Sequence, residues 1–274
     1  FHMENEEWYL KKETGRLERS QVNAYCATKE DIKSMVKFIS SYSLYAYEDE
    51  MKRGFITMQG GHRIGVAGQV VMDGGKGLSL SNIYFFNIRV AREKRGCAKD
   101  IIPYLIHRNN IYNTLFVSPP GIGKTTYLRD AIRILSNGSD RLHGMKISII
   151  DERSEIAACR QGIPQNDIGI RSDVLDGCLK SFGMLLMLRS MAPQIIAVDE
   201  IGSREDCRAM EQAIYSGSRI IGTVHAYDMK ELSRKKYLKE MLEQQMFGRI
   251  VLLEKAENGR RRFHIYDENL EKIC

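Results

Sequence analysis

The sequence has no apolar run long enough to cross a membrane as a helix. The longest candidate, residues 184–188, falls far short of the roughly 18–20 residues that a bilayer-spanning helix needs. No signal peptide is recognisable either. We therefore expect a cytoplasmic protein without a direct membrane span. Phe1 and His2, which precede Met3, are interpreted as a vector remnant, so a longer native chain could extend the first domain.

Closely spaced cysteines are also missing. None of the six cysteines forms a C-x-x-C pair, which argues against a zinc site and a redox pair and favours reduced thiols. The charge balance is only mildly basic, with 41 basic and 35 acidic residues. The basic residues form no long stripe with aromatic residues between them, so we expect no nucleic-acid partner.

The first part of the chain predicts a small α+β domain at residues 1–105. Thr28 and Asp31 have the spacing of a capping box, and apolar residues follow at helical intervals. A connecting helix is expected at residues 98–107, whereas the stretch before Ser20 has no clear pattern. Apolar and polar residues then alternate in three predicted strands, at residues 55–58, 63–72 and 83–90.

The second part, residues 106–274, predicts an α/β domain. Helical patterns separate short apolar runs, an order that is typical of a mainly parallel sheet with helices on its faces. Asn258 and Gly259 are a strong signal for a tight hairpin turn near the end of the chain. The predicted strands are residues 114–118, 146–150, 195–198, 219–224, 249–253 and 261–266.

A glycine-rich loop joins the first of these strands to a predicted helix, which is the context of a P-loop. Glycines let backbone N–H groups face an anion, and the helix N-terminus adds unpaired donors. Lys124 is expected to contact the β- and γ-phosphates of ATP, and the Thr125 hydroxyl to bind Mg²⁺. Ser118 replaces the first glycine of the usual motif. The expected nucleotide-binding residues are Pro120, Gly121, Ile122, Gly123, Lys124, Thr125 and Thr126.

Acidic residues and a histidine follow three of the other predicted strands. Asp199 is expected to hold Mg²⁺ and Glu200 to orient the attacking water, with Glu152 as a rival base after another strand. His225 follows a third strand and is interpreted as a sensor of the γ-phosphate. The alternatives are solvated surface acids and a structural histidine.

Taken together, these segments resemble the secretion ATPases that drive type II and type IV secretion and pilus assembly. More closely, they resemble the stage III sporulation protein AA family. The resemblance covers most of the chain, and its last two segments are specific while the P-loop is generic. The matching segments are residues 54–57 (GFIT), 60–63 (GGHR), 87–92 (NIRVAR), 124–130 (KTTYLRD), 151–157 (DERSEIA), 189–194 (RSMAPQ) and 198–202 (VDEIG).

The resemblance implies a RecA-like ATPase domain behind a smaller N-terminal domain. It also implies a ring-shaped homo-oligomer, a hexamer, that serves a membrane channel during endospore formation. The implied partners are the membrane proteins of that channel, at the cytoplasmic face of the mother-cell membrane. Secretion ATPases bring arginines from the N-terminal domain to the nucleotide, and Arg89 and Arg92 lie in the matching strand. The alternative is that both are surface arginines of an edge strand.

Two other functions stay open at this point. One is an ATP-gated scaffold that assembles on nucleotide but turns over little; the acidic pair Asp199 and Glu200 argues against it. The other is a nucleic-acid-dependent RecA-like motor. The residues favour an ATP-hydrolysing motor, with Lys124, Glu200, Glu152, His225, Arg89 and Arg92 as its candidate catalytic residues.

Overall fold

The structure is a computed structural model of the 274-residue chain. It describes residues 2–4, 7–11, 17–19, 27–39, 50, 54–72, 78–91, 93–139, 142–256 and 261–274. The chain divides into two compact units, one of Phe1–Ile56 with Ile64–Ile88 and one of Thr57–Arg63 with Arg89–Cys274. Residues 89–105, which we assigned to the first domain, thus group with the larger unit.

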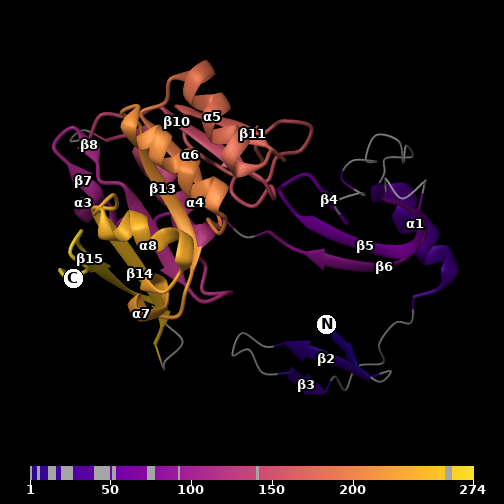
Figure 1. Cartoon of the computed structure of the whole chain (residues 1–274). Coiled ribbons are helices and arrows are strands. Elements are labelled where there is room, and N and C mark those ends of the chain that lie inside the picture. Colours follow the sequence, from indigo (N-terminus) through magenta and orange to yellow (C-terminus); the bar gives the residue numbers. More distant parts are fainter. Residues whose placement is uncertain are drawn as a thin grey trace. The chain divides into compact units, whose positions relative to one another are not determined.

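The described residues of the smaller unit include strands of different lengths and the helix α1 (Lys29–Ile39) (Figure 1). Its first sheet consists of β1 (His2–Glu4), β2 (Glu7–Lys11) and β3 (Leu17–Arg19), in the stretch that had no clear sequence pattern. The capping box is confirmed: the Asp31 backbone N–H donates to Thr28 Oγ1 and the Thr28 N–H to Asp31 Oδ2, at the start of α1 (Lys29–Ile39). The predicted strands form a second sheet of β4 (Phe55–Thr57), β5 (Arg63–Met72) and β6 (Leu78–Arg89).

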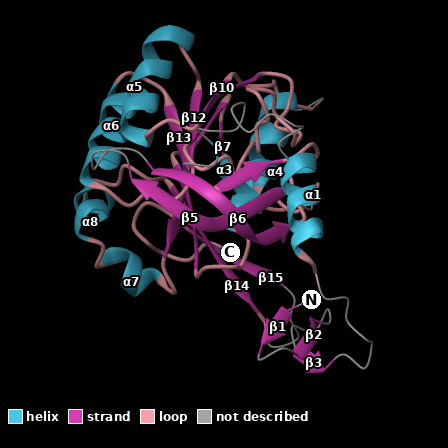
Figure 2. Ribbon diagram, turned by 90° about the vertical axis from the view of Figure 1, so that its right-hand side faces the viewer, coloured by secondary structure: helices cyan, strands magenta, loops and turns pink. Residues whose placement is uncertain are grey.

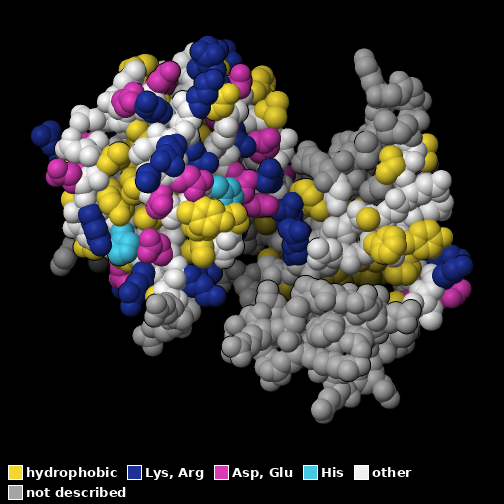
Figure 3. Space-filling model, turned by 60° about the horizontal axis from the view of Figure 1, so that its bottom comes forward, with side chains coloured by type: hydrophobic (Ala, Val, Ile, Leu, Met, Phe, Trp, Pro, Cys, Tyr) yellow, Lys and Arg dark blue, Asp and Glu magenta, His cyan; other side chains and the backbone are white. Residues whose placement is uncertain are grey.

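Large hydrophobic side chains lie on the surface of this smaller unit, as the space-filling view shows (Figure 3). An exposed group of this kind is typical of an interaction surface. Those on β5 and β6 include Val70, Val71, Tyr84, Phe85 and Ile88.

The larger unit is built on a seven-stranded sheet in the order β11-β10-β12-β13-β9-β14-β15. Neighbouring strands are parallel except for the final pair, β14 and β15. All six predicted strands are present, and only β11 was not expected. The strands are β9 (Thr114–Ser118), β10 (Ile147–Asp151), β11 (Ser172–Asp176), β12 (Ile195–Val198), β13 (Arg219–His225), β14 (Arg249–Lys255) and β15 (Arg261–Tyr266). The predicted turn at Asn258 and Gly259 lies outside the described residues.

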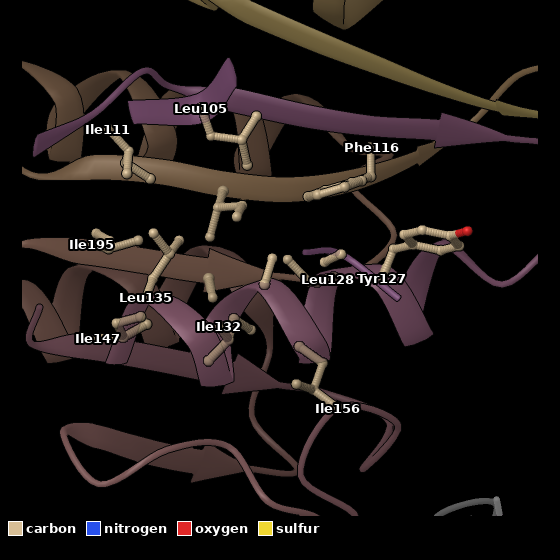
Figure 4. Close-up of a cluster of buried hydrophobic side chains, with 14 of the residues drawn as sticks. Leu105, Ile111, Phe116, Tyr127, Leu128, Ile132, Leu135, Ile147, Ile156 and Ile195 are labelled. Atoms are coloured by element: carbon tan, nitrogen blue, oxygen red, sulfur yellow. The ribbon is translucent and has the colours of Figure 1, made fainter. Parts of the chain in front are cut away.

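Helices cover both faces of this sheet (Figure 2). Phe116 points to one face, where it packs with α4 (Lys124–Asn137), and Leu115 and Val117 point to the other. Side chains from β9, α4, β10 and β12 meet in the first of these two cores (Figure 4). The second core includes α5 (Lys180–Met191), α6 (Arg204–Tyr215), α7 (Met229–Ser233) and α8 (Lys236–Glu243). Side chains along each strand point alternately to the two faces of the sheet. Because both faces are buried, the strands appear in the sequence as continuous apolar runs.

The connecting helix expected at residues 98–107 is largely absent. Turns precede a single helical turn, α3 (Ile102–Leu105), and the chain then becomes extended at Ile106. Ile106 instead begins a short hairpin of β7 (Ile106–His107) and β8 (Asn110–Ile111). The Tyr112 N–H donates to the Leu105 carbonyl, so hairpin pairing takes the place of a further helical turn. No helix in the described ranges is long and apolar enough to cross a membrane.

Candidate functional site

The phosphate loop leaves the buried strand β9 and enters α4, as the motif predicts. Gly121 has φ 79°, and Gly123, which caps the helix, has φ 105°; both conformations are unfavourable for residues with a Cβ. Among the described residues, nothing lies within 4 Å of the Cβ position at Gly121, so the space beside this glycine is open. Ser118, in place of the first glycine, is fully buried, and its hydroxyl donates to the Pro119 carbonyl. The loop therefore has the backbone shape of an anion cradle.

Lys124 is buried at the first position of α4, and its ammonium faces the end of β13. The Nζ atom lies 2.8 Å from Nδ1 and 2.9 Å from Nε2 of His225. His225 Nε2 in turn lies 3.0 Å from Glu200 Oε1. Burial lowers the pKa of Lys124, and the negative charges of Asp199, Glu200 and Glu155 oppose that decrease. The structure thus joins three of the predicted site residues, Lys124, His225 and Glu200, in one cluster.

Thr125 and Asp199 also meet at this edge of the sheet. The Thr125 hydroxyl donates to Asp199 Oδ2 at 2.7 Å, and the Thr223 hydroxyl donates to Oδ1 of the same carboxylate. Burial raises the pKa of Asp199, although these two hydrogen bonds favour its charged form. Within the described residues, no group of three His, Cys, Asp or Glu side chains is placed to hold a metal ion. A hydroxyl and a carboxylate oxygen fit Mg²⁺, which takes few protein ligands and completes its shell with phosphates and water.

Glu200 follows Asp199 with a backbone φ of 52°, a conformation that non-glycine residues rarely adopt. Its N–H donates to Thr223 Oγ1 at 2.8 Å, which fixes the turn after β12. Its carboxylate contacts His225 and accepts a 2.5 Å bond from Arg153. Partial burial disfavours ionisation of Glu200, but the hydrogen bond from His225 and the charge of Arg153 outweigh it and lower the pKa. Glu200 is therefore a carboxylate at neutral pH.

The acidic run after β10 separates into residues with different partners. The Asp151 carboxylate is buried and accepts the backbone N–H groups of Glu155, Ile156 and Ala157 at 2.8–3.0 Å. Burial raises the pKa of Asp151 to about 6, while these hydrogen bonds oppose the increase. Glu152 forms an ion pair with Lys180 on α5. Asp151 thus shapes the loop, and the role of Glu152 as a rival base stays a prediction.

Two residues that the sequence did not single out, Arg63 and Arg129, join the site with Glu155, which belongs to the predicted acidic run. They line a hollow of about 220 Å³ together with Thr125 and Arg89. Arg63 Nη1 lies 2.6 Å from Glu155 Oε1, and Arg129 donates to the carbonyls of Glu155 and Ile156. Arg63 and Arg129 lie in segments that carry the resemblance, but nothing in the sequence indicated that both contact Glu155. Arg92, the other predicted arginine, lies outside the described residues.

The helix that carries Lys124 is also tied to the segment that precedes β9. The Asp130 carboxylate, 3% exposed, accepts the backbone N–H groups of Gly96 and Ala98 at 3.0 and 2.8 Å and pairs with Arg133. Burial disfavours the charged form, but these partners outweigh it and lower the pKa of Asp130. Asp130 therefore holds the segment at Gly96 to the helix, and the Cys97 thiol adds a contact to the Thr126 carbonyl.

Asp130→Asn should lower the free energy of unfolding by about 2 kcal/mol, because an amide replaces a charge-assisted acceptor of buried donors. Urea unfolding followed by circular dichroism measures the change. Asp228→Asn is the matched control: Asp228 is exposed and caps α7, where asparagine caps equally well. Equal stability changes in the two variants would contradict the role assigned to Asp130.

The chain matches a family model and known relatives in sequence. Residues 7–273 match the family model described as "Sporulation stage III, protein AA". Stage III sporulation protein AA of Bacillus subtilis (strain 168) is 42% identical over 246 residues, covering 90% of this chain and 80% of that protein. "Uncharacterized protein ycf45" of Cyanidium caldarium is 32% identical over 155 residues, 56% of this chain and 44% of that protein.

Solved structures show the same fold. The ATPase DotB of Legionella pneumophila has a TM-score of 0.59 and 17% identity, covering 92% of this chain and 71% of that chain. The pilus retraction motor PilT with bound ADP has a TM-score of 0.59 and 15% identity, covering 94% of this chain and 74% of that chain. The larger unit thus has a RecA-like α/β fold. The chain itself belongs to the family of sporulation stage III protein AA.

Proposed function

We propose that this protein hydrolyses ATP with Mg²⁺ and is the motor of a secretion or channel complex in endospore formation. The observation that carries the proposal is the convergence at one sheet edge of Lys124, Thr125 bonded to Asp199, and Glu200 in contact with Arg153 and His225. A glycine loop that only binds phosphate needs neither the Thr125–Asp199 pair nor Glu200. That the fold is shared with an ATPase and a pilus motor adds support.

Each group has a distinct task in this proposal. The loop N–H groups and Lys124 bind the phosphates, and residues Pro120 to Thr126 form the cradle. Thr125 and Asp199 would hold Mg²⁺, which would supply positive charge to the phosphates. Their present hydrogen bond already aligns the two oxygen atoms toward each other.

Glu200 is the base that we propose for water activation. Its carboxylate is charged and is held on two sides, by Arg153 and by His225. Because His225 contacts both Glu200 and the Lys124 ammonium, it is placed to couple phosphate binding to the position of the base. This contact supports the sensor role over a purely structural histidine. Glu152, paired with Lys180, is the less favoured base.

Arg89 is proposed to add positive charge next to the transferring phosphate. It lines the same hollow as Thr125 within one chain. In phosphoryl-transfer enzymes, an arginine beside the transferred phosphate raises kcat by about 10³–10⁵-fold. Arg92 is retained as a second candidate on the basis of the sequence.

The remaining parts of the proposal concern assembly and place. We propose a ring-shaped homo-oligomer, a hexamer, at the cytoplasmic face of the mother-cell membrane, in contact with membrane proteins of the sporulation channel. The exposed hydrophobic side chains of β5 and β6 support an interaction surface on the smaller unit. The acidic pair Asp199 and Glu200 beside the phosphate loop disfavours an ATP-gated scaffold.

Hydrolysis per chain should rise with protein concentration if the ring is the active form, because assembly follows mass action. A dilution series should record phosphate release and particle mass on the same samples. Specific activity that stays flat while the mass stays that of a monomer would contradict the motor assembly. Duplex or single-stranded nucleic acid added to parallel samples should leave the rate unchanged; a large stimulation would favour the nucleic-acid motor instead.

A further inference from the structure

The C-terminal hairpin reaches the phosphate loop from the side opposite the acidic residues. β9 lies between β13 and β14, and β14 runs parallel to it, with Leu252 opposite Val117. The ends of β9 and β14 therefore lie at the same edge of the sheet. β15 returns antiparallel, with Arg261 opposite Lys255. The register thus brings the first residue of β15 to the edge where the loop begins.

Arg261 uses this position to cover Gly123. A Cβ built on Gly123 would lie 3.1 Å from Cζ, 3.1 Å from Nη2 and 3.2 Å from Nη1 of Arg261. Three nearly equal distances mean that the guanidinium lies with its face toward the glycine. Gly123 therefore leaves room for this side chain as well as adopting a positive φ.

The guanidinium has no anionic partner among the described residues, whose ion pairs do not include Arg261. Its side chain is exposed, so a ligand in the loop has access to it. Its charge also reaches the first turns of α4, where burial raises the pKa of Tyr127 and Arg261 opposes that increase. A planar cation that no described carboxylate pairs with, beside an anion cradle, is suited to bind phosphate through two N–H groups.

We propose that Arg261 is a nucleotide-binding residue that contacts the phosphate chain of the nucleotide from the C-terminal hairpin. This inference rests on the proposed function. Asp199, Glu200 and His225 approach from the β12 and β13 side of β9, whereas Arg261 approaches from the β14 side. Arg261 is thus separated from the groups assigned to the γ-phosphate. It should stabilise bound ADP and ATP alike, which changes KM and leaves kcat nearly unaltered.

The test compares Arg261→Ala with Arg262→Ala, the neighbouring exposed arginine, whose side chain points to the opposite face of the strand. Calorimetric titration should show ADP and ATP binding about 10- to 100-fold weaker in Arg261→Ala, as expected for a lost charged hydrogen-bond pair. Arg262→Ala should bind both like the wild type. Arg261→Lys should recover part of the affinity, because it restores the charge without the planar fork.

Titration with inorganic tripolyphosphate identifies the contacted group. A similar loss of tripolyphosphate affinity in Arg261→Ala supports the phosphate contact. Unchanged tripolyphosphate affinity, with nucleotide affinity reduced, would overturn it in favour of a contact to the nucleoside. Equal nucleotide affinities for Arg261→Ala, Arg262→Ala and the wild type would also overturn it. Failure of the wild-type chain to bind either nucleotide would contradict the proposed function, and this inference with it.

Discussion

Lys124→Ala should weaken ATP binding by at least about 100-fold and reduce hydrolysis to background, because charge-assisted contacts of a partly desolvated ammonium are worth about 2–3 kcal/mol or more. Lys124 is 5% exposed and starts α4 directly after the glycine loop. In the proposed site, its removal would leave the β- and γ-phosphates without their nearest counter-charge. Calorimetric titration with ATP and a phosphate-release assay measure the two effects.

The control for this variant is Lys239→Ala. Lys239 lies on α8, is 61% exposed and pairs with Glu243 on the same helix, so its removal tests the loss of a lysine away from the loop. Both variants need unfolding curves, because the loss of Lys124 also leaves a small void beside His225. A Lys124→Ala protein that is folded and hydrolyses ATP at the wild-type rate would refute the phosphate-loop assignment.

Glu200→Gln should retain ATP affinity within about threefold and lower kcat by about 10²–10⁴, the range that general-base catalysis contributes. Glutamine preserves the shape of the side chain and can still contact Arg153 and His225, but it cannot accept a proton from water. The ion pair with Arg153 is 62% exposed on the arginine side, so its loss should change stability little. Single-turnover and steady-state rates, measured at saturating ATP, separate chemistry from binding.

Glu152→Gln is the matched comparison, since Glu152 is the rival base and is held by Lys180. We expect its kcat to remain within a factor of about ten of the wild-type value, well above that of Glu200→Gln. A fully active Glu200→Gln beside an inactive Glu152→Gln would transfer the catalytic role to Glu152.

Much of the larger unit could be predicted from the sequence because its strands are buried on both faces. Runs such as residues 195–198 are wholly apolar and end in charged residues, which marks both the strand and the sheet edge. The P-loop is defined by the local backbone, so its glycines and Lys124 were recognisable without any distant contact. The same locality explains why the Thr28 capping box was predicted correctly.

The features that were missed depend on partners far away in the chain. β11 is half-buried and polar, and the edge of the sheet, not its own sequence, makes it a strand. Arg63 and Glu155 are 92 residues apart, and Arg261 follows Gly123 by more than a hundred residues. Residues 98–107 have helical spacing, but the hairpin at Ile106 and Ile111 competes successfully for the backbone.

The most direct test of the account is the rate of phosphate release by the purified wild-type chain with ATP, measured in Mg²⁺ and again in excess EDTA. The site should turn over in Mg²⁺ at a rate well above that of Lys124→Ala and Glu200→Gln. In EDTA the rate should fall to that of the variants, because the chelator removes the Mg²⁺ that Thr125 and Asp199 are proposed to hold together with the phosphates. Wild-type turnover no greater than that of Glu200→Gln in Mg²⁺ would contradict the claim that this site hydrolyses ATP.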